Sequence, residues 1–430
     1  MKIYCTNEKV NKIPKGFHFI LNLTDKTQIN YTFWDKKLKF THPYSSTAID
    51  LLMISLFVFS ADKLVSRSDQ KDSWTREITL SIPVSSTAFW EHEKTNLIQM
   101  LNFLSGDNWQ FIFRQKTFFE EEHFSQSINN KKIKKRNYST ICMLSGGLDS
   151  YIGAIDLLGS KNDNILFVSH YGGGKGTKEN QDTLFDILQK AYHLNSSDYQ
   201  QFYAICKHSV ESSTRTRSFL FFSHAIALAS AMKDPINIII PENGFISLNI
   251  PITQSRFGSS STRTTHPFYM KYFKSIVKDI NPNISIKNPY QFFTKGEMIN
   301  NCKNQKLLQE TYTLSMSCSH PDIGRYKKLR KPMHCGYCIP CIIRQAAINF
   351  GFGSDNTEYR DIPINSSDTK RVNYNAYNIF ISKYENFSPY LAIQESGMIE
   401  ENIEEIAKMF ERGLAEIKKF IKNSNKQGTT

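Results

Sequence analysis

The hydrophobic positions fall into two patterns that divide the chain. Residues 1–126 combine short alternating runs, such as GFHFILNL and REITLSIPV, with helical periodicity in stretches such as AIDLLMISLFVFSADKLV. We expect an α+β domain here, closed by a strand in NWQFIFRQ. Residues 127–137 are basic and lose the apolar pattern, which is typical of a linker.

From residue 138 onward, apolar runs alternate with stretches of helical periodicity. The runs TICML, NILFVSHY, QQFYAICKH and INIIIPENG predict buried strands, and the helices between them predict right-handed crossovers. We therefore expect an α/β domain with a parallel sheet over residues 138–350. The remainder, 351–430, predicts a helical tail that ends in an amphipathic helix with one apolar stripe: Ile403, Ile406, Phe410, Leu414 and Ile417.

Several polar residues follow the ends of these predicted strands. Ligands of open parallel sheets bind at the carboxyl ends of the strands. This rule predicts that Ser145, His170, His208 and Glu242 share one edge of the sheet, which we take as the candidate active site. The two histidines could equally be hydrogen-bonded loop residues.

The stretch TICMLSGGLDSYIG predicts a strand, a turn over Ser145–Ser150 and then a helix. Gly146 and Gly147 leave no side chain between the backbone N–H groups and an anion, and the helix points its positive end at the same place. The turn therefore predicts a phosphate site. It lacks the lysine of a Walker A loop. The alternative is a glycine turn that simply ends a core strand.

Arginines supply a second indication of an anionic ligand. Arg215 and Arg217 precede an apolar helix, where a cation opposes the helix dipole, so we expect an anionic group nearby. An acidic substrate would serve. The following long polar loop carries Arg256 and Arg263, whose guanidinium groups suit carboxylate or phosphate. We assign four residues to substrate binding: Glu242, Asn243, Arg256 and Arg263.

Four cysteines have the spacing of a metal site. Cys335, Cys338 and Cys341 form a C-x-x-C-x-x-C run, and Cys318 lies upstream. Four thiolates fit tetrahedral Zn²⁺. An iron–sulfur cluster is the rival, and His320 or His334 could replace Cys318. The other cysteines are expected to be buried or free thiols: Cys5, Cys142, Cys206 and Cys302.

Composition narrows the classes of partner. The 430 residues are 40% hydrophobic and carry a formal net charge of +13, which favours anionic partners such as nucleotides or nucleic acid. Nucleic acid is not indicated by any RNA-binding motif. No run approaches the roughly 20 apolar residues of a membrane helix, and the first residues contain no apolar signal core. We expect a soluble, cytoplasmic protein with no membrane contact.

The residues SGGLDS resemble the SGG-x-DS loop of the PP-loop ATP pyrophosphatases. Together with the arginine-led helix and the CGYCIPCIIR ending, they resemble the QueC-like family of 7-cyano-7-deazaguanine synthases over about residues 138–350. The overall layout is similar to the QatC type found in anti-phage operons. The chain departs from QueC in its first 130 or so residues and in its tail.

This resemblance implies a HUP-like, adenine nucleotide alpha hydrolase sheet and an enzyme that uses ATP and Mg²⁺. Such enzymes adenylate 7-carboxy-7-deazaguanine, release pyrophosphate and let ammonia form an amide and then a nitrile, as in queuosine biosynthesis. We expect four catalytic residues: Ser145, Asp149, Ser150 and Arg217. We expect nucleotide contacts from Leu144, Ser145, Gly146, Gly147, Leu148, Asp149, Ser150, Tyr151 and His170, and zinc ligation by Cys318, Cys335, Cys338 and Cys341.

Three other functions stay open. A sulfur-transferring enzyme that modifies tRNA would use the same loop but needs a reactive cysteine pair. A nucleotide-binding defence subunit would bind ATP without turnover, and a third type would pass the acyl group to an amine on a partner protein from the same operon. We expect residues 1–126 to select the partner or substrate and to take no part in adenylation. We also expect Ser145→Ala and Asp149→Ala to abolish turnover without affecting the fold, because both lie in a turn.

Overall fold

The computed structural model describes most of the chain. The described residues are 1–34, 40, 42–117, 138–160, 164–172, 174–233, 235–252, 263–322, 331–361, 368–384 and 388–427. The predicted linker 127–137 and Arg256 lie outside them.

The larger sheet has six strands in the order β10-β9-β6-β7-β8-β3. Five of them are mutually parallel, and β3 joins antiparallel to β8. The strands are β3 (Ile29–Tyr31), β6 (Thr140–Met143), β7 (Ile165–Tyr171), β8 (Tyr199–Cys206), β9 (Ile236–Ile239) and β10 (Ile284–Lys287). The parallel α/β architecture predicted for this region is confirmed. The chain adds β7 and β8 on one side of β6 and then β9 and β10 on the other, so the strand order reverses between β6 and β9. Open α/β sheets leave a crevice for ligands at such a switch point.

Side chains of β6 alternate between two hydrophobic cores, as a sheet covered on both faces requires. Cys142 and Leu144 pack with α4 (Leu148–Gly159) and α5 (Lys175–Tyr192). Ile141 and Met143 pack on the opposite face with α6 (Arg217–Ala229) and α9 (Pro267–Ile280). The continuous apolar run in the sequence therefore reflects burial on both sides.

The second sheet has four strands in the order β2-β1-β4-β5, and all of its pairings are parallel. Its elements are β1 (Lys2–Thr6), β2 (Phe19–Asn22), α1 (Ser46–Leu64), β4 (Glu77–Val84), α2 (Thr87–Ser105) and β5 (Asn108–Gln115). The expected α+β arrangement of residues 1–126 is therefore wrong for the described residues. Because α2 joins neighbouring strands β4 and β5 as a crossover, those strands run parallel.

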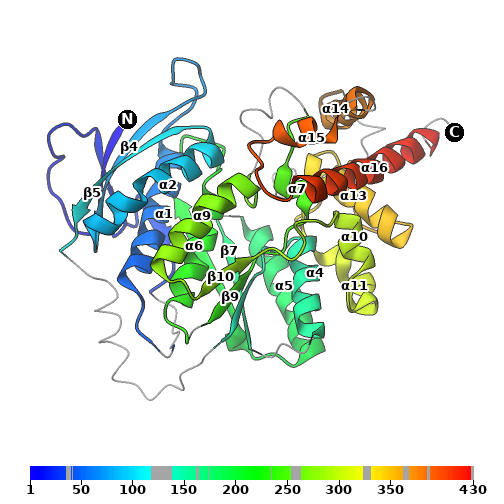
Figure 1. The fold of residues 1–430 in the computed structure, drawn as a ribbon, viewed down its shortest axis with the longest axis horizontal. Coiled ribbons are helices and arrows are strands. Elements are labelled where there is room, and N and C mark those ends of the chain that lie inside the picture. Colours follow the sequence, from blue (N-terminus) through cyan, green and yellow to red (C-terminus); the bar gives the residue numbers. More distant parts are fainter. Residues whose placement is uncertain are drawn as a thin grey trace.

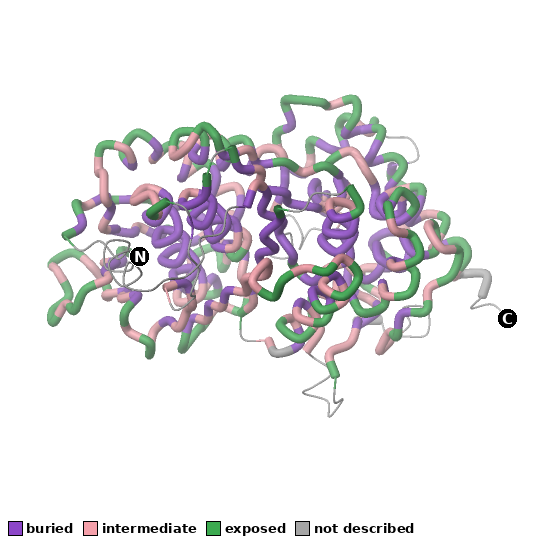
Figure 2. The backbone as a smooth tube through the Cα atoms, turned by 90° about the horizontal axis from the view of Figure 1, so that it is seen from below, coloured by how far each residue is buried: buried purple, intermediate pink, exposed green. Residues whose placement is uncertain are grey.

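The N-terminal elements share a core with the rest of the chain. Helix α1 packs on α6, and α2 packs on α9, so one hydrophobic cluster runs from the four-stranded sheet to the six-stranded sheet. The strand inside QINYTFWD is β3, which pairs with β8 of the larger sheet. Figure 1 shows α6 and α9 between the N-terminal helices and the larger sheet, and Figure 2 shows the buried backbone running through both halves of the molecule.

The remaining described α-helices follow β9 in the chain and lie beside the larger sheet. They are α7 (Gly244–Leu248), α10 (Lys295–Asn300), α11 (Gln305–Thr311), α13 (Ile339–Phe352), α14 (Asp368–Tyr384), α15 (Pro389–Gln394) and α16 (Ile403–Gln427). Of the predicted stripe on α16, Ile406, Phe410 and Ile417 are buried. Helix α16 packs on α13 and α15. Among the described residues, no helix has both the length and the apolar character needed to cross a membrane.

Candidate nucleotide site and four-cysteine cluster

The Ser145–Ser150 loop lies between β6 and α4, at the switch point of the sheet. The Ser150 hydroxyl accepts the Ser145 N–H (3.1 Å) and lies 3.0 Å from the Ser145 hydroxyl, so the two serines close the turn. Gly146 has a φ of 91°, a left-handed conformation that favours glycine. The amide of Gln181 on α5 donates to the carbonyl oxygens of Ser145 (3.0 Å) and His170 (3.1 Å) and so fixes the loop against β7.

The loop presents backbone donors to the space in front of it. Among the described residues, the N–H groups of Gly146, Asp149 and Ser150 have no acceptor. These groups surround the first turn of α4, where the helix dipole adds partial positive charge. This arrangement suits an anion such as a phosphate group.

Asp149 does not lie free in a surface turn, as the sequence suggested. It is buried, forms an ion pair with Lys295 on α10, and accepts a hydrogen bond from the side-chain amide of Asn243 (2.6 Å). Its removal would leave the Lys295 ammonium group buried without its partner. The expectation that Asp149→Ala leaves the fold unaffected therefore needs correction, because buried ion pairs are costly to break on one side only.

A cavity of about 550 Å³ opens in front of the loop. Of the predicted site residues, it is lined by Ser145, Gly146, Gly147, Leu148, Asp149, Ser150, His170, Arg217, Glu242 and Cys318. Met143, Phe221 and Phe222 add an apolar wall. Ten of the residues that the sequence predicted for the site therefore line one cavity beside the Ser145–Ser150 loop.

His170 ends β7 at the wall of this cavity and is 5% exposed. Burial lowers the pKa of His170 well below its ordinary value of 6.5, and the nearby His224 and Arg217 lower it further. The His170 Nε2 atom is buried and has no hydrogen-bond partner among the described residues. His170 is therefore a neutral side chain whose Nε2 atom is enclosed by the protein.

Glu242 follows β9 on the other side of the switch point. Burial raises its pKa from 4.5 to about 7, and the Asp149 carboxylate acts in the same direction. The Thr265 hydroxyl donates a hydrogen bond to Glu242. A carboxyl group with this pKa can exchange a proton near neutral pH.

The anionic group expected near Arg215 and Arg217 is Asp62 of α1. Its carboxylate accepts the N–H groups of Arg215 (3.0 Å) and Thr216 (3.2 Å) and the hydroxyl of Thr216 (2.9 Å). The Arg215 guanidinium group stacks over Trp74 and donates to the Ser105 carbonyl oxygen. Both arginines line the cavity, and no described carboxylate pairs with Arg217 there.

Cys318, Cys335, Cys338 and Cys341 form one cluster in which all four sulfur atoms lie within 4.8 Å of one another. The Cys318–Cys338 and Cys335–Cys341 sulfur distances are 4.0 Å and 3.9 Å. Tetrahedral Zn²⁺ with bonds of about 2.3 Å requires sulfur separations of about 3.8 Å. The cluster could therefore hold a metal such as zinc, and Cys318, not a histidine, completes it.

Backbone N–H groups point at two of the sulfur atoms and hold the cluster in place. The N–H groups of His320 and Cys335 each lie 3.3 Å from the Cys318 sulfur, and that of Cys338 lies 3.3 Å from the Cys335 sulfur. Gly336 has a φ of 87°, and a Cβ atom there would lie 1.9 Å from a carbonyl oxygen. The glycine of CGYC is thus required by the turn between two ligands.

The cysteine cluster and the Ser145–Ser150 loop are joined directly. The Met316 N–H donates to the Gly146 carbonyl oxygen (2.8 Å), and the Leu148 N–H approaches the Ser317 hydroxyl (3.4 Å). Buried Arg344 donates to the Ser315 hydroxyl and the Tyr312 carbonyl oxygen, both at 2.8 Å. A metal at the cysteines would therefore stabilise one wall of the cavity.

Other predicted residues lie outside the cavity. Leu144 and Tyr151 are fully buried, and the Tyr151 hydroxyl pairs with Thr311. Arg263 stacks over Phe103 of α2 and donates to its carbonyl oxygen (3.0 Å). His208 is exposed, because β8 extends three residues past the position that pairs with the end of β7. We leave these residues out of the site.

Sequence reasoning missed Lys295, Gln181 and Arg344. Lys295 is the first residue of α10 and follows the capping residue Thr294. A cation at this end of a helix opposes the helix dipole. The same signal had identified Arg217. Arg344 follows the last cysteine by three residues and is fully buried.

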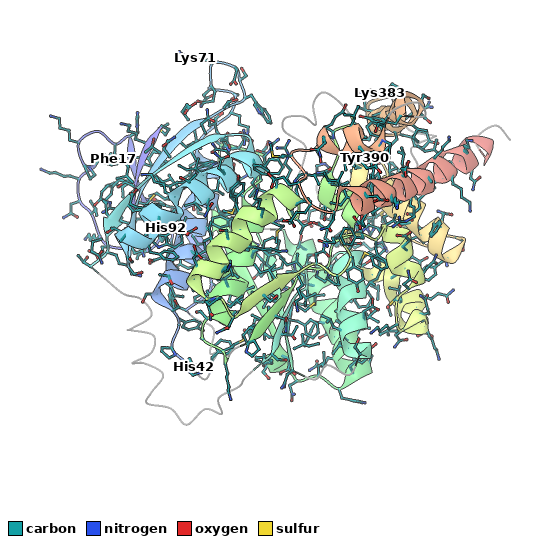
Figure 3. The ribbon with its side chains drawn as sticks, viewed as in Figure 1. Phe17, His42, Lys71, His92, Lys383 and Tyr390 are labelled. Carbon is teal, nitrogen blue, oxygen red and sulfur yellow. The ribbon has the colours of Figure 1, made fainter. Side chains whose placement is uncertain are left out.

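A second group of possible ligands lies elsewhere. His92, Glu93 and Asp279 place their ligand atoms within 4.8 Å of one another. Figure 3 labels His92 on α2, on the side of the molecule formed by the N-terminal elements. The Glu93 carboxylate already accepts the amide of Asn96 (2.9 Å) and contacts the His92 ring (2.9 Å), and the group does not line the cavity.

Comparison of the chain with protein-family models, with curated proteins and with solved structures found no match.

Proposed function

We propose that this chain is an ATP-dependent enzyme that activates a carboxylate by adenylation and releases pyrophosphate. The observation that carries the proposal is the set of N–H groups in the Ser145–Ser150 loop that have no acceptor among the described residues, at the mouth of a cavity of about 550 Å³. The same cavity is lined by Arg217 and Lys295. Donors and cations directed at one space suit the phosphates of a nucleotide.

The residues support a division of roles. The substrate carboxylate oxygen would attack the α-phosphorus atom, and the bond to pyrophosphate would break with its electron pair on the leaving group. The loop N–H groups and Arg217 would stabilise the negative charge that develops there. Gln181 and the two serines hold the loop in the required conformation before ligands bind.

The cavity wall formed by Phe221, Phe222 and Met143 suits a flat heterocyclic ring. His170, whose neutral ring lies beside Phe221, lines the cavity next to this wall. A deazapurine carboxylate, 7-carboxy-7-deazaguanine, is the substrate that the sequence resemblance implies. Amide or nitrile formation would follow adenylation.

The resemblance implies two metals, Zn²⁺ and Mg²⁺, and the described residues fit the first better than the second. The cysteine cluster fits Zn²⁺. Because four protein ligands leave no open coordination position for chemistry, this zinc ion would have a structural role. Among the described residues, the carboxylates that line the cavity are Asp149 and Glu242. Lys295 and Asn243 engage both oxygens of Asp149, so we derive no step through Mg²⁺.

Sulfur transfer to tRNA is less well supported. Such chemistry needs a reactive thiol in addition to any metal ligands. Burial raises the pKa of Cys5, Cys142, Cys206 and Cys302, and none of these four lines the cavity. The remaining four cysteines belong to the cluster. A subunit that binds ATP without turnover would release no AMP or pyrophosphate, so analysis of the reaction products distinguishes it from the proposed enzyme.

Mass spectrometry of a reaction containing purified protein, ATP, 7-carboxy-7-deazaguanine and ammonia tests the proposal. AMP and pyrophosphate should appear in equal amounts, together with the amide or nitrile. ADP and phosphate as products, or no nucleotide turnover with any carboxylate tested, would contradict it.

A further inference from the structure

A second cavity of about 280 Å³ lies next to the first. The two share Ile240 at the end of β9. Its other walls come from α7, the start of α9 and α16, and include Ser247, Thr265 and Met409. Lys271 and Glu400, which form an exposed ion pair, line it as well, so it reaches the surface.

A chain of hydrogen bonds crosses the wall between the two cavities. Glu242 lines the first cavity and accepts a hydrogen bond from the Thr265 hydroxyl. The Thr265 hydroxyl in turn lies 2.5 Å from the Ser247 hydroxyl. Thr265 and Ser247 line the second cavity, and they are 6% and 5% exposed.

This chain can reverse its direction. Each hydroxyl group can donate one hydrogen bond and accept others. When Glu242 is ionised, Thr265 donates to it and accepts from Ser247. When Glu242 is protonated, all the bonds can turn around, which moves a proton toward the second cavity.

We propose that Glu242, Thr265 and Ser247 form a relay that carries protons from the reaction in the first cavity to solvent in the second. The inference rests on the proposed function. When an amine attacks the acyl adenylate, a C–N bond forms, the C–O bond to AMP breaks, and AMP leaves with that electron pair. The nitrogen then loses a proton, which passes to the Glu242 carboxylate and onward through the two hydroxyls. Glu242 is ionised again for the next turnover.

Filling of the first cavity by nucleotide and substrate makes such an outlet necessary, because it removes bulk water from around Glu242. Among the described residues, the charged groups that act on the pKa of Glu242 are Asp149, which raises it, and Lys295, which lowers it. The raised pKa of Glu242 suits a group that gains and loses a proton in every cycle.

Thr265→Val in the full-length, metal-loaded protein tests the relay, because valine keeps the shape and removes the hydroxyl. Two rates are measured with ATP and 7-carboxy-7-deazaguanine: exchange of labelled pyrophosphate into ATP, which needs no amine, and amide formation with ammonia between pH 6 and 9. We expect exchange within about twofold of wild type and amide formation lower by about tenfold or more. Thr265→Ser should restore amide formation and its pH profile. Ser223→Ala, which removes an equally buried hydroxyl outside the relay, should change neither rate.

Amide formation at the wild-type rate in Thr265→Val would overturn the relay. So would an equal loss of exchange and amide formation that Thr265→Ser does not restore, since that pattern indicates a structural role. If the wild-type protein shows no exchange, the proposed function fails, and the relay fails with it.

Discussion

The Asp62 carboxylate of α1 accepts hydrogen bonds from both the backbone N–H and the hydroxyl of Thr216, the residue that precedes α6. A side chain of the N-terminal segment thus caps the helix that places Arg217 in the cavity. Arg76 also pairs with Asp62, so the capping carboxylate is itself held in place. The N-terminal segment is therefore part of the scaffold of the candidate site.

Replacement of Asp62 by alanine should destabilise the whole protein. The change removes the cap of α6 and leaves the fully buried Arg76 with Asp107 alone. We expect a loss of about 3–5 kcal/mol in the free energy of unfolding, measured by urea denaturation. Asp69→Ala, which removes an exposed carboxylate of the same segment, is the control. If Asp62→Ala and the wild-type protein unfold with the same urea midpoint, the capping role is refuted.

The same contact changes what we expect of a truncated protein that begins at Asn137. If residues 1–126 took no part in adenylation, as the sequence analysis expects, such a protein would keep adenylation activity. Truncation removes Asp62, strand β3 and the helices that cover α6 and α9. We now expect an insoluble or unfolded product because a large apolar surface would be exposed. A soluble truncation with intact pyrophosphate exchange would show that the original expectation was right.

The Asp149–Lys295 ion pair predicts that substitutions of these two residues have coupled effects on the free energy of unfolding. Lys295→Met alone leaves a buried carboxylate without its cation and should lower the free energy of unfolding by about 3–5 kcal/mol. The double variant Asp149→Asn with Lys295→Met should regain most of that stability but no pyrophosphate exchange. Urea denaturation of the two single variants and the double variant measures the coupling. Additive losses would show that the two side chains do not interact.

Sequence reasoning was most successful where one local pattern determines the structure. The run from Thr140 to Ser150 predicted strand β6, the glycine turn and helix α4, because burial on both faces and the turn residues leave few alternatives. The cysteine spacing likewise predicted the cluster. Both depend on residues close together in the chain.

Contacts between distant residues could not be predicted in this way. Nothing in QINYTFWD indicates that its strand pairs with β8, since edge strands carry no signal for their partner. The partners of Asp149 and Arg215 lie 146 and 153 residues away in the chain. The apolar α1 stretch contains two carboxylates, Asp50 and Asp62, whose burial and ion pairs with Lys116 and Arg76 were not predicted from the sequence.

Glu242 predicts how stability depends on pH. Its pKa is raised from 4.5 to about 7 in the folded protein, so the folded state binds a proton more tightly than the unfolded state between these values. Stability from this group is present below about pH 4.5 and is lost as the pH rises through 7. Glu242→Gln should therefore raise Tm by about 1–3 °C at pH 8 and little at pH 5.

Calorimetry at both pH values measures this difference, with the exposed Glu310→Gln as control. Burial also raises the pKa of Glu416 to about 7, so part of the pH dependence should remain in Glu242→Gln. A Tm gain that is equal at pH 5 and pH 8 would contradict the raised pKa of Glu242.

The cysteine cluster predicts about one zinc ion per chain. Cys318→Ser should lower both the zinc content and Tm, because metal binding contributes directly to folding. Since Met316 and Ser317 contact the Ser145–Ser150 loop, chelation should also weaken the proposed nucleotide binding. Metal analysis with Cys302→Ser, a buried cysteine outside the cluster, gives the comparison. Iron and sulfide in place of zinc would establish a different metal centre.

Exchange of labelled pyrophosphate into ATP tests the central claim most directly, since it reports reversible adenylation without an amine. The full-length protein with 7-carboxy-7-deazaguanine should catalyse exchange only when the carboxylate is present. Ser145→Ala, which removes a hydroxyl that closes the loop, should lower the rate by about a hundredfold, while Ser160→Ala at the other end of α4 should not change it. Wild-type exchange in Ser145→Ala, or exchange that does not require the carboxylate, would contradict the account.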